Sequence, residues 1–125
     1  TAATKGGEGV FTAIGCATCH VPMLRTGPSE QPLFDRKPVP LFSDLLLHDV
    51  GTGDGIGQGD AAPNEIRTPA LWGLRFRRIL LHDGSAGSIE DAIERHAQEA
   101  ALAREEFRRL DEGRLPALLA FLSSL

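Results

Sequence analysis

The chain has 125 residues, a length that suits one domain built around one hydrophobic core. Its 13 Lys and Arg are dispersed among 17 Asp and Glu, and the resulting formal net charge of −4 argues against nucleic acid as a partner. No apolar run approaches the ~20 residues of a membrane span, and the N-terminus lacks the apolar segment of a signal peptide. We therefore expect a single domain over residues 1–125, with no membrane span in this chain.

The N-terminal part of the chain predicts one helix followed by a loop. Val10, Phe11 and Ile14 place apolar groups on one face of a helix over about residues 5–15. Five prolines then fall between residues 21 and 40. Because proline removes backbone donors and biases its neighbours away from helix, we expect a loop in this segment.

The middle of the chain predicts short helices separated by a glycine-rich loop. Ser43 and Asp44 are suited to cap a short helix over residues 45–48. Five glycines in residues 51–59 are typical of a loop that wraps something closely, or of one that is merely flexible. Residues 68–74, with a proline in the first turn, predict another short helix.

The C-terminal part predicts two further helices. Ser88 and Asp91 resemble a capping box that opens a helix reaching about Ala101. The last helix carries the i, i+3, i+4, i+7 stripe of a core-facing surface, made by Leu115, Leu118, Leu119 and Leu122. Since no segment alternates with period two, we predict an all-α domain of short helices and long loops.

The motif CATCH, from Cys16 to His20, contains both cysteines of the chain. A structural zinc site needs four ligands, and no second cysteine pair or histidine pair follows. A thioredoxin-like redox pair belongs to a βαβ pattern, which this sequence does not show. Haem attachment explains every residue of the motif, because Cys16 and Cys19 form thioethers to the vinyl groups while His20 reaches the iron. Zinc and a redox pair stay open as minor alternatives.

Gly7 lies four residues before Phe11 on the first predicted helix. A residue without a side chain at this position suits a close crossing by the C-terminal helix, with Phe121 as its partner. An ordinary helix start and an ordinary core residue explain Gly7 and Phe11 equally well.

Five ordered segments carry a resemblance to a known family. They are GCATCHVPMLRTG, LFSDLLLHDVG, EIRTPALWGL, LLHDGSAGSIEDAIERHAQEA and LLAFLSSL. In this order they resemble the C-terminal haem domain of the di-haem oxidoreductase family, the thiol oxidoreductase-like c-type cytochromes, and more distantly the bacterial cytochrome c peroxidase/MauG superfamily. The resemblance implies a class I cytochrome c-like fold around one haem c, bound covalently through Cys16 and Cys19 and by His20. Those relatives usually have two haem motifs in a longer chain, and a methionine often stands in place of Val50.

The sixth iron position decides whether a haem passes electrons or does chemistry. Met23, the only methionine, follows His20 so closely that it would lie on the wrong side of the porphyrin. We predict His48 as the sixth ligand, because it ends an apolar run and precedes the glycine-rich loop, although a helix-terminal histidine explains it equally well. His82 and His96 are the other histidines able to ligate, and they are more typical of a turn and of a solvated helix face.

Four further residues are candidates for supporting roles. Arg67 and Trp72 could donate hydrogen bonds to the haem propionates, but a surface arginine and a core tryptophan explain them equally well. Asp44 and Asp49 are close enough in sequence to orient His48, whereas a helix cap and a turn residue are the simpler interpretations.

The expected function is one-electron transfer by a monohaem c-type cytochrome, with redox proteins as partners. Arg75, Arg77 and Arg78 form a positive patch that suits an acidic redox partner, although a solvated loop is the simpler interpretation. The alternatives are a haem enzyme with an open sixth position, either peroxidase-like or acting on a small substrate, and a gas-binding sensor. Because bacterial haem c is attached on the periplasmic side, we expect an exported protein whose signal has been removed.

Overall fold

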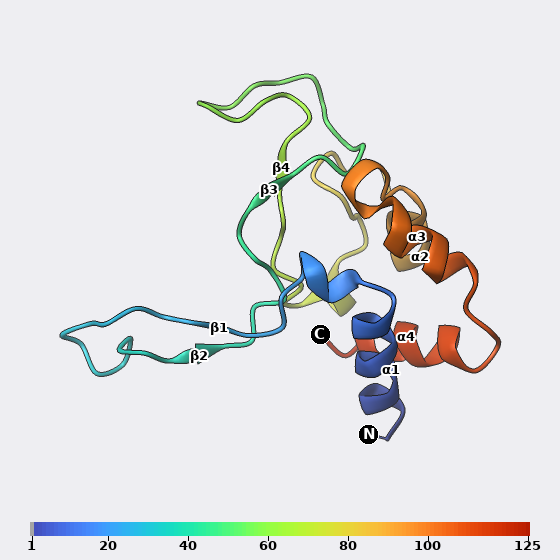
Figure 1. Ribbon diagram of the computed structural model, residues 1–125, viewed down its shortest axis with the longest axis horizontal. Coiled ribbons are helices and arrows are strands. Elements are labelled where there is room, and N and C mark those ends of the chain that lie inside the picture. Colours follow the sequence, from blue (N-terminus) through green and yellow to red (C-terminus); the bar gives the residue numbers. More distant parts are fainter. Residues whose placement is uncertain (1) are drawn as a thin grey trace.

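The structure is a computed structural model that describes residues 2–125, and it combines two crossing helices with long excursions of loop (Figure 1). The α-helices are α1 (Ala2–Ala13), α2 (Ile89–Glu94), α3 (Ala101–Arg108) and α4 (Arg114–Leu122). The 3-10 turns are η1 (Cys16–Thr18), η2 (Leu74–Phe76) and η3 (Gln98–Ala100). The strands are β1 (Leu24–Arg25), β2 (Pro38–Val39), β3 (Leu47–His48) and β4 (Ile66–Arg67). Within these residues no helix is long and apolar enough to cross a membrane.

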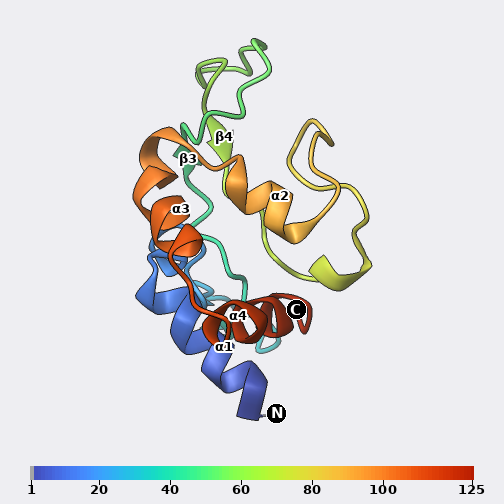
Figure 2. The ribbon, with the colours of Figure 1, turned by 90° about the vertical axis from the view of Figure 1, so that its right-hand side faces the viewer.

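The hydrophobic core forms where α1 crosses α4, near both ends of the chain (Figure 2). Gly7 lies at the crossing, because a Cβ on this residue would come within 2.5 Å of the Cβ of Phe121. The rings of Phe11, Phe42 and Phe121 pack edge to face, with centroids 5.5 to 6.1 Å apart. The predicted close crossing of the first and last helices is therefore confirmed, and the apolar faces of both helices are closed by protein alone.

The capping prediction at Ser88 is also confirmed, but the helix that it opens is shorter than expected. The Ser88 hydroxyl accepts a hydrogen bond from the backbone N–H of Asp91 at 3.0 Å. The helix ends at Glu94, and the backbone N–H of Ala97 donates instead to the carbonyl of Val50 at 2.8 Å. This long-range bond holds residue 97 in an extended conformation, so the chain starts a separate helix, α3, only at Ala101.

The all-α prediction is wrong, because the described residues contain two small antiparallel sheets and only about a third of them are helical. Within the proline-rich segment, β1 pairs with β2, with Leu24 opposite Val39. In the second sheet β3 pairs with β4, with His48 opposite Ile66. Proline excludes helix but tolerates extended chain at a sheet edge, so the prolines left this segment free to pair.

The predicted helix over residues 45–48 is absent, and the two residues expected to cap it explain why. The Ser43 hydroxyl accepts a hydrogen bond from the Leu45 N–H at 2.9 Å, and the Asp44 carboxylate accepts one from the Leu46 N–H at 2.9 Å. These local bonds form consecutive turns that compete with a helix, and Leu45 adopts a φ of 62°. The chain leaves the turns extended and enters β3.

The predicted helix over residues 68–74 is likewise absent. The carbonyl of Thr68 accepts a hydrogen bond from the buried hydroxyl of Ser43 at 2.7 Å, and its N–H donates to the carbonyl of Leu46 at 3.0 Å. These two long-range bonds tie the backbone of Thr68 to residues 43 and 46, and the chain does not begin a helix there. Helical geometry appears only in the single turn η2, which begins at Leu74.

Candidate functional site

The CATCH segment lies where α1 ends and the chain reverses its direction. Gly15 makes the reversal with a left-handed φ of 93°, and η1 begins at Cys16. The backbone N–H of His20 then donates to the carbonyl of Cys16 at 3.0 Å, which closes the segment on itself. The two cysteines and the histidine are therefore held in one compact turn against the end of the core.

The imidazole of His20 is oriented by a single hydrogen bond. Its Nδ1 lies 3.0 Å from the carbonyl oxygen of Phe42, to which it donates, so Nε2 is the nitrogen left to bind a metal. Burial lowers the pKa of His20, and this favours the neutral ring that metal ligation requires. A histidine fixed through one nitrogen and free at the other is the usual arrangement of a metal ligand.

Residues 42–44 hold the motif in place through its backbone. The Ser43 N–H donates to the carbonyl of Val21 at 3.0 Å, and the Asp44 N–H donates to the carbonyl of Cys19 at 2.8 Å. Together with the bond from His20, these contacts fix the motif along its second half. No sequence pattern predicts this role of residues 42–44, since they lie more than twenty positions from the residues that they contact.

Both cysteines are free thiols and both are half-buried. Burial raises the pKa of Cys16 to about 11 and also raises the pKa of Cys19. Redox-active cysteines instead carry a lowered pKa, because the thiolate is the reactive form. The surroundings of this pair therefore do not suit thiol–disulfide exchange.

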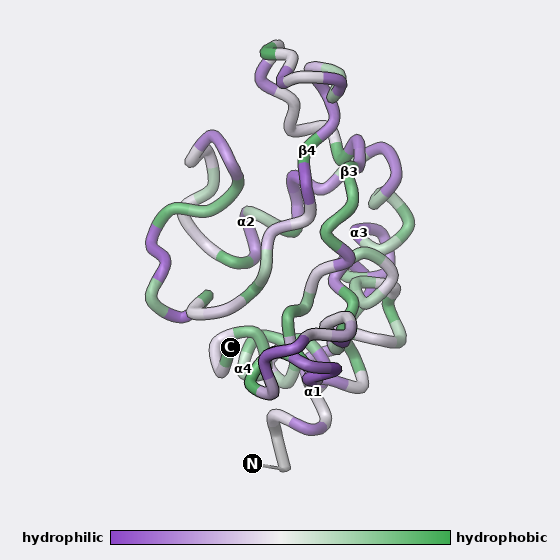
Figure 3. Tube along the Cα trace, turned by 90° about the vertical axis from the view of Figure 1, so that its left-hand side faces the viewer, coloured by the Kyte–Doolittle hydropathy of each residue, from purple (hydrophilic) through white to green (hydrophobic). Residues whose placement is uncertain are grey.

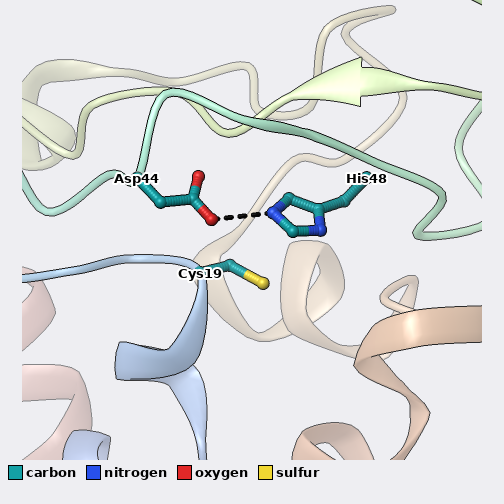
Figure 4. Close-up of side chains that lie close together, drawn as sticks. All are labelled: Cys19, Asp44 and His48. Atoms are coloured by element: carbon teal, nitrogen blue, oxygen red, sulfur yellow. Dashed lines mark hydrogen bonds and ion pairs between the residues drawn. The ribbon is translucent and has the colours of Figure 1, made fainter.

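Cys19, Asp44 and His48 form a cluster of three potential metal donors (Figure 4). One donor atom from each residue lies within 4.8 Å of the other two. In Figure 4 the Asp44 carboxylate points to the His48 ring, and the Cys19 sulfur lies below both. Three donors fall short of the four of a structural zinc site.

The ring of His48 lies between two carboxylates. Its Nδ1 is 2.9 Å from the Glu99 carboxylate, and its Nε2 is 2.7 Å from the Asp44 carboxylate. These hydrogen bonds, that of Glu99 first, raise the pKa of His48 and favour the charged ring. Asp44 does contact His48, as suggested, but at Nε2, the nitrogen that a ligand would turn to the iron. Asp49 does not contact the His48 ring, since its carboxylate accepts hydrogen bonds from the Asn64 side chain and from the Gly51 N–H. The assignment of His48 as sixth ligand stays a prediction.

Glu99 is a partner of His48 that no sequence pattern predicts. It lies 51 positions from His48, and its second oxygen also accepts from the Asp49 backbone N–H at 2.8 Å. A surface glutamate on a short helical turn carries no pattern that distinguishes it from its neighbours. Its role depends entirely on how η3 packs against β3.

The remaining two histidines differ in which nitrogen is free. The Nδ1 of His96 donates to the carbonyl of Ala92 at 2.7 Å, so Nε2 is left available, as in His20. His96 lies close enough to His20 to lower the pKa of that ring, in addition to the larger effect of burial. His82 instead pairs through Nε2 with the Asp54 carboxylate at 3.1 Å.

The two predicted propionate donors lie on the exposed side of the chain. Arg67 is exposed on β4. The indole N–H of Trp72 donates to the carbonyl of Pro40 at 2.6 Å, and the side chain is 52% exposed. The structure therefore gives the Trp72 N–H a protein acceptor, while the role of both residues toward a propionate stays a prediction.

Apolar side chains without protein cover lie beside the motif. Leu45, Leu46 and Leu47 are 49%, 60% and 46% exposed, and Met23 is 51% exposed. Figure 3 shows the hydrophobic stretch that leads into β3. The motif offers two cysteine thiols and a neutral imidazole with a free Nε2, and half-exposed leucines lie beside it. These groups fit a haem attached through cysteine.

Comparisons with known proteins point in the same direction. Residues 1–125 match the family described as "Di-haem oxidoreductase, putative peroxidase". The chain is 30% identical over 102 residues to methylamine utilization protein MauG from Methylorubrum extorquens, an alignment that covers 74% of this chain and 24% of MauG. The chain thus spans about a quarter of the length of that relative. No solved structure matches. With the match extending over the whole sequence, the chain belongs to the di-haem oxidoreductase family.

Proposed function

We propose that this chain is a monohaem c-type cytochrome domain, extending over residues 1–125, that transfers single electrons. One observation carries the proposal: His20 follows two cysteines at the end of α1 and is fixed through Nδ1 with Nε2 left free. Cys16 and Cys19 would hold the haem c as thioethers, and His20 would bind its iron. The haem supplies a metal that changes between the ferrous and ferric states.

The protein contributes the position of the ligand and the exclusion of water. The Phe42 carbonyl holds the His20 ring, while the bonds from Ser43 and Asp44 keep the cysteine turn rigid. Leu45, Leu46 and Leu47 would cover the apolar porphyrin, because they follow directly after Asp44, which contacts the motif, and about half of each residue's surface is still exposed.

For the sixth position we propose His96, with His48 kept as the prediction from sequence. His96 already has the hydrogen bonding of a ligand, since Nδ1 is held by Ala92 and Nε2 is free. His48 would first have to release the Asp44 carboxylate from Nε2, although Glu99 could then remain on Nδ1 as an orienting partner. Either histidine gives a bis-imidazole iron with a lower potential than a His/Met pair.

The optical spectrum of the haem-loaded protein tests these assignments. The colour should stay with the protein in acid–acetone, because thioether bonds survive denaturation. His96→Ala should convert a low-spin spectrum to a high-spin one, while the matched variants His48→Ala and His82→Ala leave the spin state unchanged. A change in His48→Ala alone would give the sixth position to His48, and haem extracted into acid–acetone would end the proposal.

A second candidate function is peroxidase-like chemistry, which the description of the matched family favours. It requires a sixth position that is open or weakly held, so that peroxide can reach the iron. The same spectrum separates the two functions. A high-spin unmutated protein that reacts readily with peroxide would replace the electron carrier by the enzyme.

The cofactor chemistry also supports a location and a class of partner. Because haem c is attached on the periplasmic side in bacteria, we propose a periplasmic or otherwise exported protein that exchanges electrons with redox proteins. Fractionation of cells that produce the untagged protein tests the location, and haem-containing protein confined to the cytoplasm would contradict it.

A further inference from the structure

The arginines of residues 66–82 are set apart from the other charges of the chain. This segment contains Arg67, Arg75, Arg77 and Arg78, and all 17 Asp and Glu of the sequence lie outside it. Five other arginines form ion pairs with carboxylates: Arg36, Arg95, Arg104, Arg108 and Arg109. Among residues 2–125 no ion pair involves an arginine of this segment. Arg75, Arg77 and Arg78 are exposed and nearly consecutive, so a chain of net charge −4 has a concentration of positive charge here.

Residues 74–79, of which 75–79 are all exposed, contain three of these arginines, and we name them the arginine loop. Two of its three apolar side chains are turned to solvent, since Phe76 is 76% exposed and Ile79 is 67% exposed. The guanidinium of Arg75 lies 4.7 Å from the centre of the Phe76 ring. An apolar centre flanked by arginines has the composition of a protein interface, where aromatic residues and Arg are enriched.

The arginine loop is anchored at both ends. Leu74 and Leu80 are buried in the core at 8% and 9% exposure. The N–H of Gly73 donates to the carbonyl of Leu125 at 2.9 Å, and the N–H of Leu80 donates to the carbonyl of Ala86 at 2.8 Å. In Figure 2 the loop lies on the side of the molecule opposite α3. A surface held in this way is presented to a partner with little loss of conformational freedom.

We propose that the arginine loop is the docking surface for an acidic redox protein. The inference rests on the proposed electron-transfer function and adds the surface and the charge of its partner. Charge complementarity selects the occupant, because unpaired arginines attract a surface rich in carboxylates and raise the rate of encounter. Phe76 and Ile79 supply the apolar contact that holds the complex after it has formed.

Stopped-flow reduction of the haem-loaded protein by reduced plant-type [2Fe–2S] ferredoxin, a small acidic redox protein, tests the proposal. Arg75→Glu with Arg78→Glu should lower the second-order rate constant about tenfold at low ionic strength and flatten its dependence on salt. The matched control is Lys5→Glu with Arg114→Glu, which changes the net charge equally at two exposed side chains outside the loop. The control should leave the rate within about twofold of the unmutated protein.

Separate measurements keep this proposal distinct from the proposed function. The haem spectrum and the reduction by dithionite should be the same in both double variants as in the unmutated protein. If the unmutated protein itself lacks a haem spectrum or is not reduced by dithionite, the proposed function is wrong, whatever the docking surface. Equal slowing in both variants would show that net charge alone matters and would overturn the docking surface. Sedimentation gives a second test. Self-association of the unmutated protein that disappears only in Arg75→Glu with Arg78→Glu would overturn the proposal, because a second copy of the chain would then occupy the loop.

Discussion

The helix crossing and the loops around the CATCH motif differ in how completely the protein packs itself. At the crossing of α1 and α4, Phe11, Leu118 and Phe121 are buried and the two backbones approach closely at Gly7. Beside the motif, the leucines before β3 are half-exposed and the chain is held by scattered hydrogen bonds. The crossing is buried by protein, whereas the loops beside the motif leave apolar side chains half-exposed, where the proposed haem would cover them.

The largest effect should come from the variant that removes the proposed haem attachment. If Cys16 and Cys19 hold a haem as proposed, Cys16→Ser with Cys19→Ser should abolish covalent haem and lower the hydrogen-exchange protection of β3 and β4 by about 100-fold, because the loops beside the motif would lose the group that covers them. Protection in α1 and α4 should fall much less. Mass spectrometry and hydrogen exchange measure both results. An equal loss in the two regions would show that the helix crossing also depends on haem.

A smaller effect is expected at the crossing itself. Gly7→Ala should lower the free energy of unfolding by roughly 1–3 kcal/mol, because the new methyl group would collide with the Ala117 carbonyl and the Phe121 side chain. Gly9→Ala is the matched control on the same helix, since its Cβ meets nothing within 4 Å. The control should raise stability by up to about 1 kcal/mol through helix propensity.

Denaturant unfolding of the two variants measures the difference directly. If Gly7→Ala is as stable as Gly9→Ala, α1 and α4 are farther apart than the structure shows. The close packing of the helix crossing, which distinguishes it from the loop region, would then be contradicted.

Ser43 connects the two halves of the loop region, and its removal should have a comparable or slightly smaller effect. Its buried hydroxyl donates to the Thr68 carbonyl and accepts from the Leu45 N–H, so Ser43→Ala leaves two backbone groups without their partner. The expected loss is roughly 1–3 kcal/mol. Ser29→Ala, which removes one exposed bond to the Gln31 N–H, should cost less than about 0.5 kcal/mol.

Most features predicted from sequence depend on residues that are close together in the chain. Apolar spacing marks α1 and α4, and the Ser88 cap depends on an N–H three residues away. Gly7 and Phe121 were matched across the chain because a missing side chain on one helix implies a close neighbour. The CATCH motif was recognised because three chemical groups lie within five residues.

The features that were missed depend on distant partners. The strands are two residues long, so no alternation could reveal them, and each is fixed by a segment that lies 13 or more positions away. Ser43 and Asp44 are good helix caps by composition, yet the tie from Ser43 to Thr68 turns them into a different structure. The carboxylate of Glu99 on His48 follows from the placement of η3, which no local pattern encodes.

The smallest predicted effect is the pH dependence of the stability contributed by His48 and its carboxylate partners. Hydrogen bonds to Glu99 and then to Asp44 raise the pKa of His48, so the folded protein binds this proton more tightly than the unfolded chain. The stability that protonated His48 adds to the fold is fully present below the ordinary histidine pKa of about 6.5. It is lost as the pH rises through the higher pKa of the folded protein. Hydrogen bonds from the Leu46 N–H and from His48 outweigh burial and lower the pKa of Asp44, so that contribution is lost in acid.

Both contributions are therefore present together between about pH 4 and pH 6.5. Relative to His48→Gln, the unmutated holoprotein should be more stable at pH 5 than at pH 9, by a fraction of the Ser43 effect. Chemical denaturation at the two pH values measures this difference, and His82→Gln serves as the control. If His48 binds the iron, it cannot take up the proton at Nε2, so the pH dependence disappears and the spectrum of His48→Gln changes. The same pair of measurements thus decides whether His48 binds the iron or only pairs with Asp44 and Glu99.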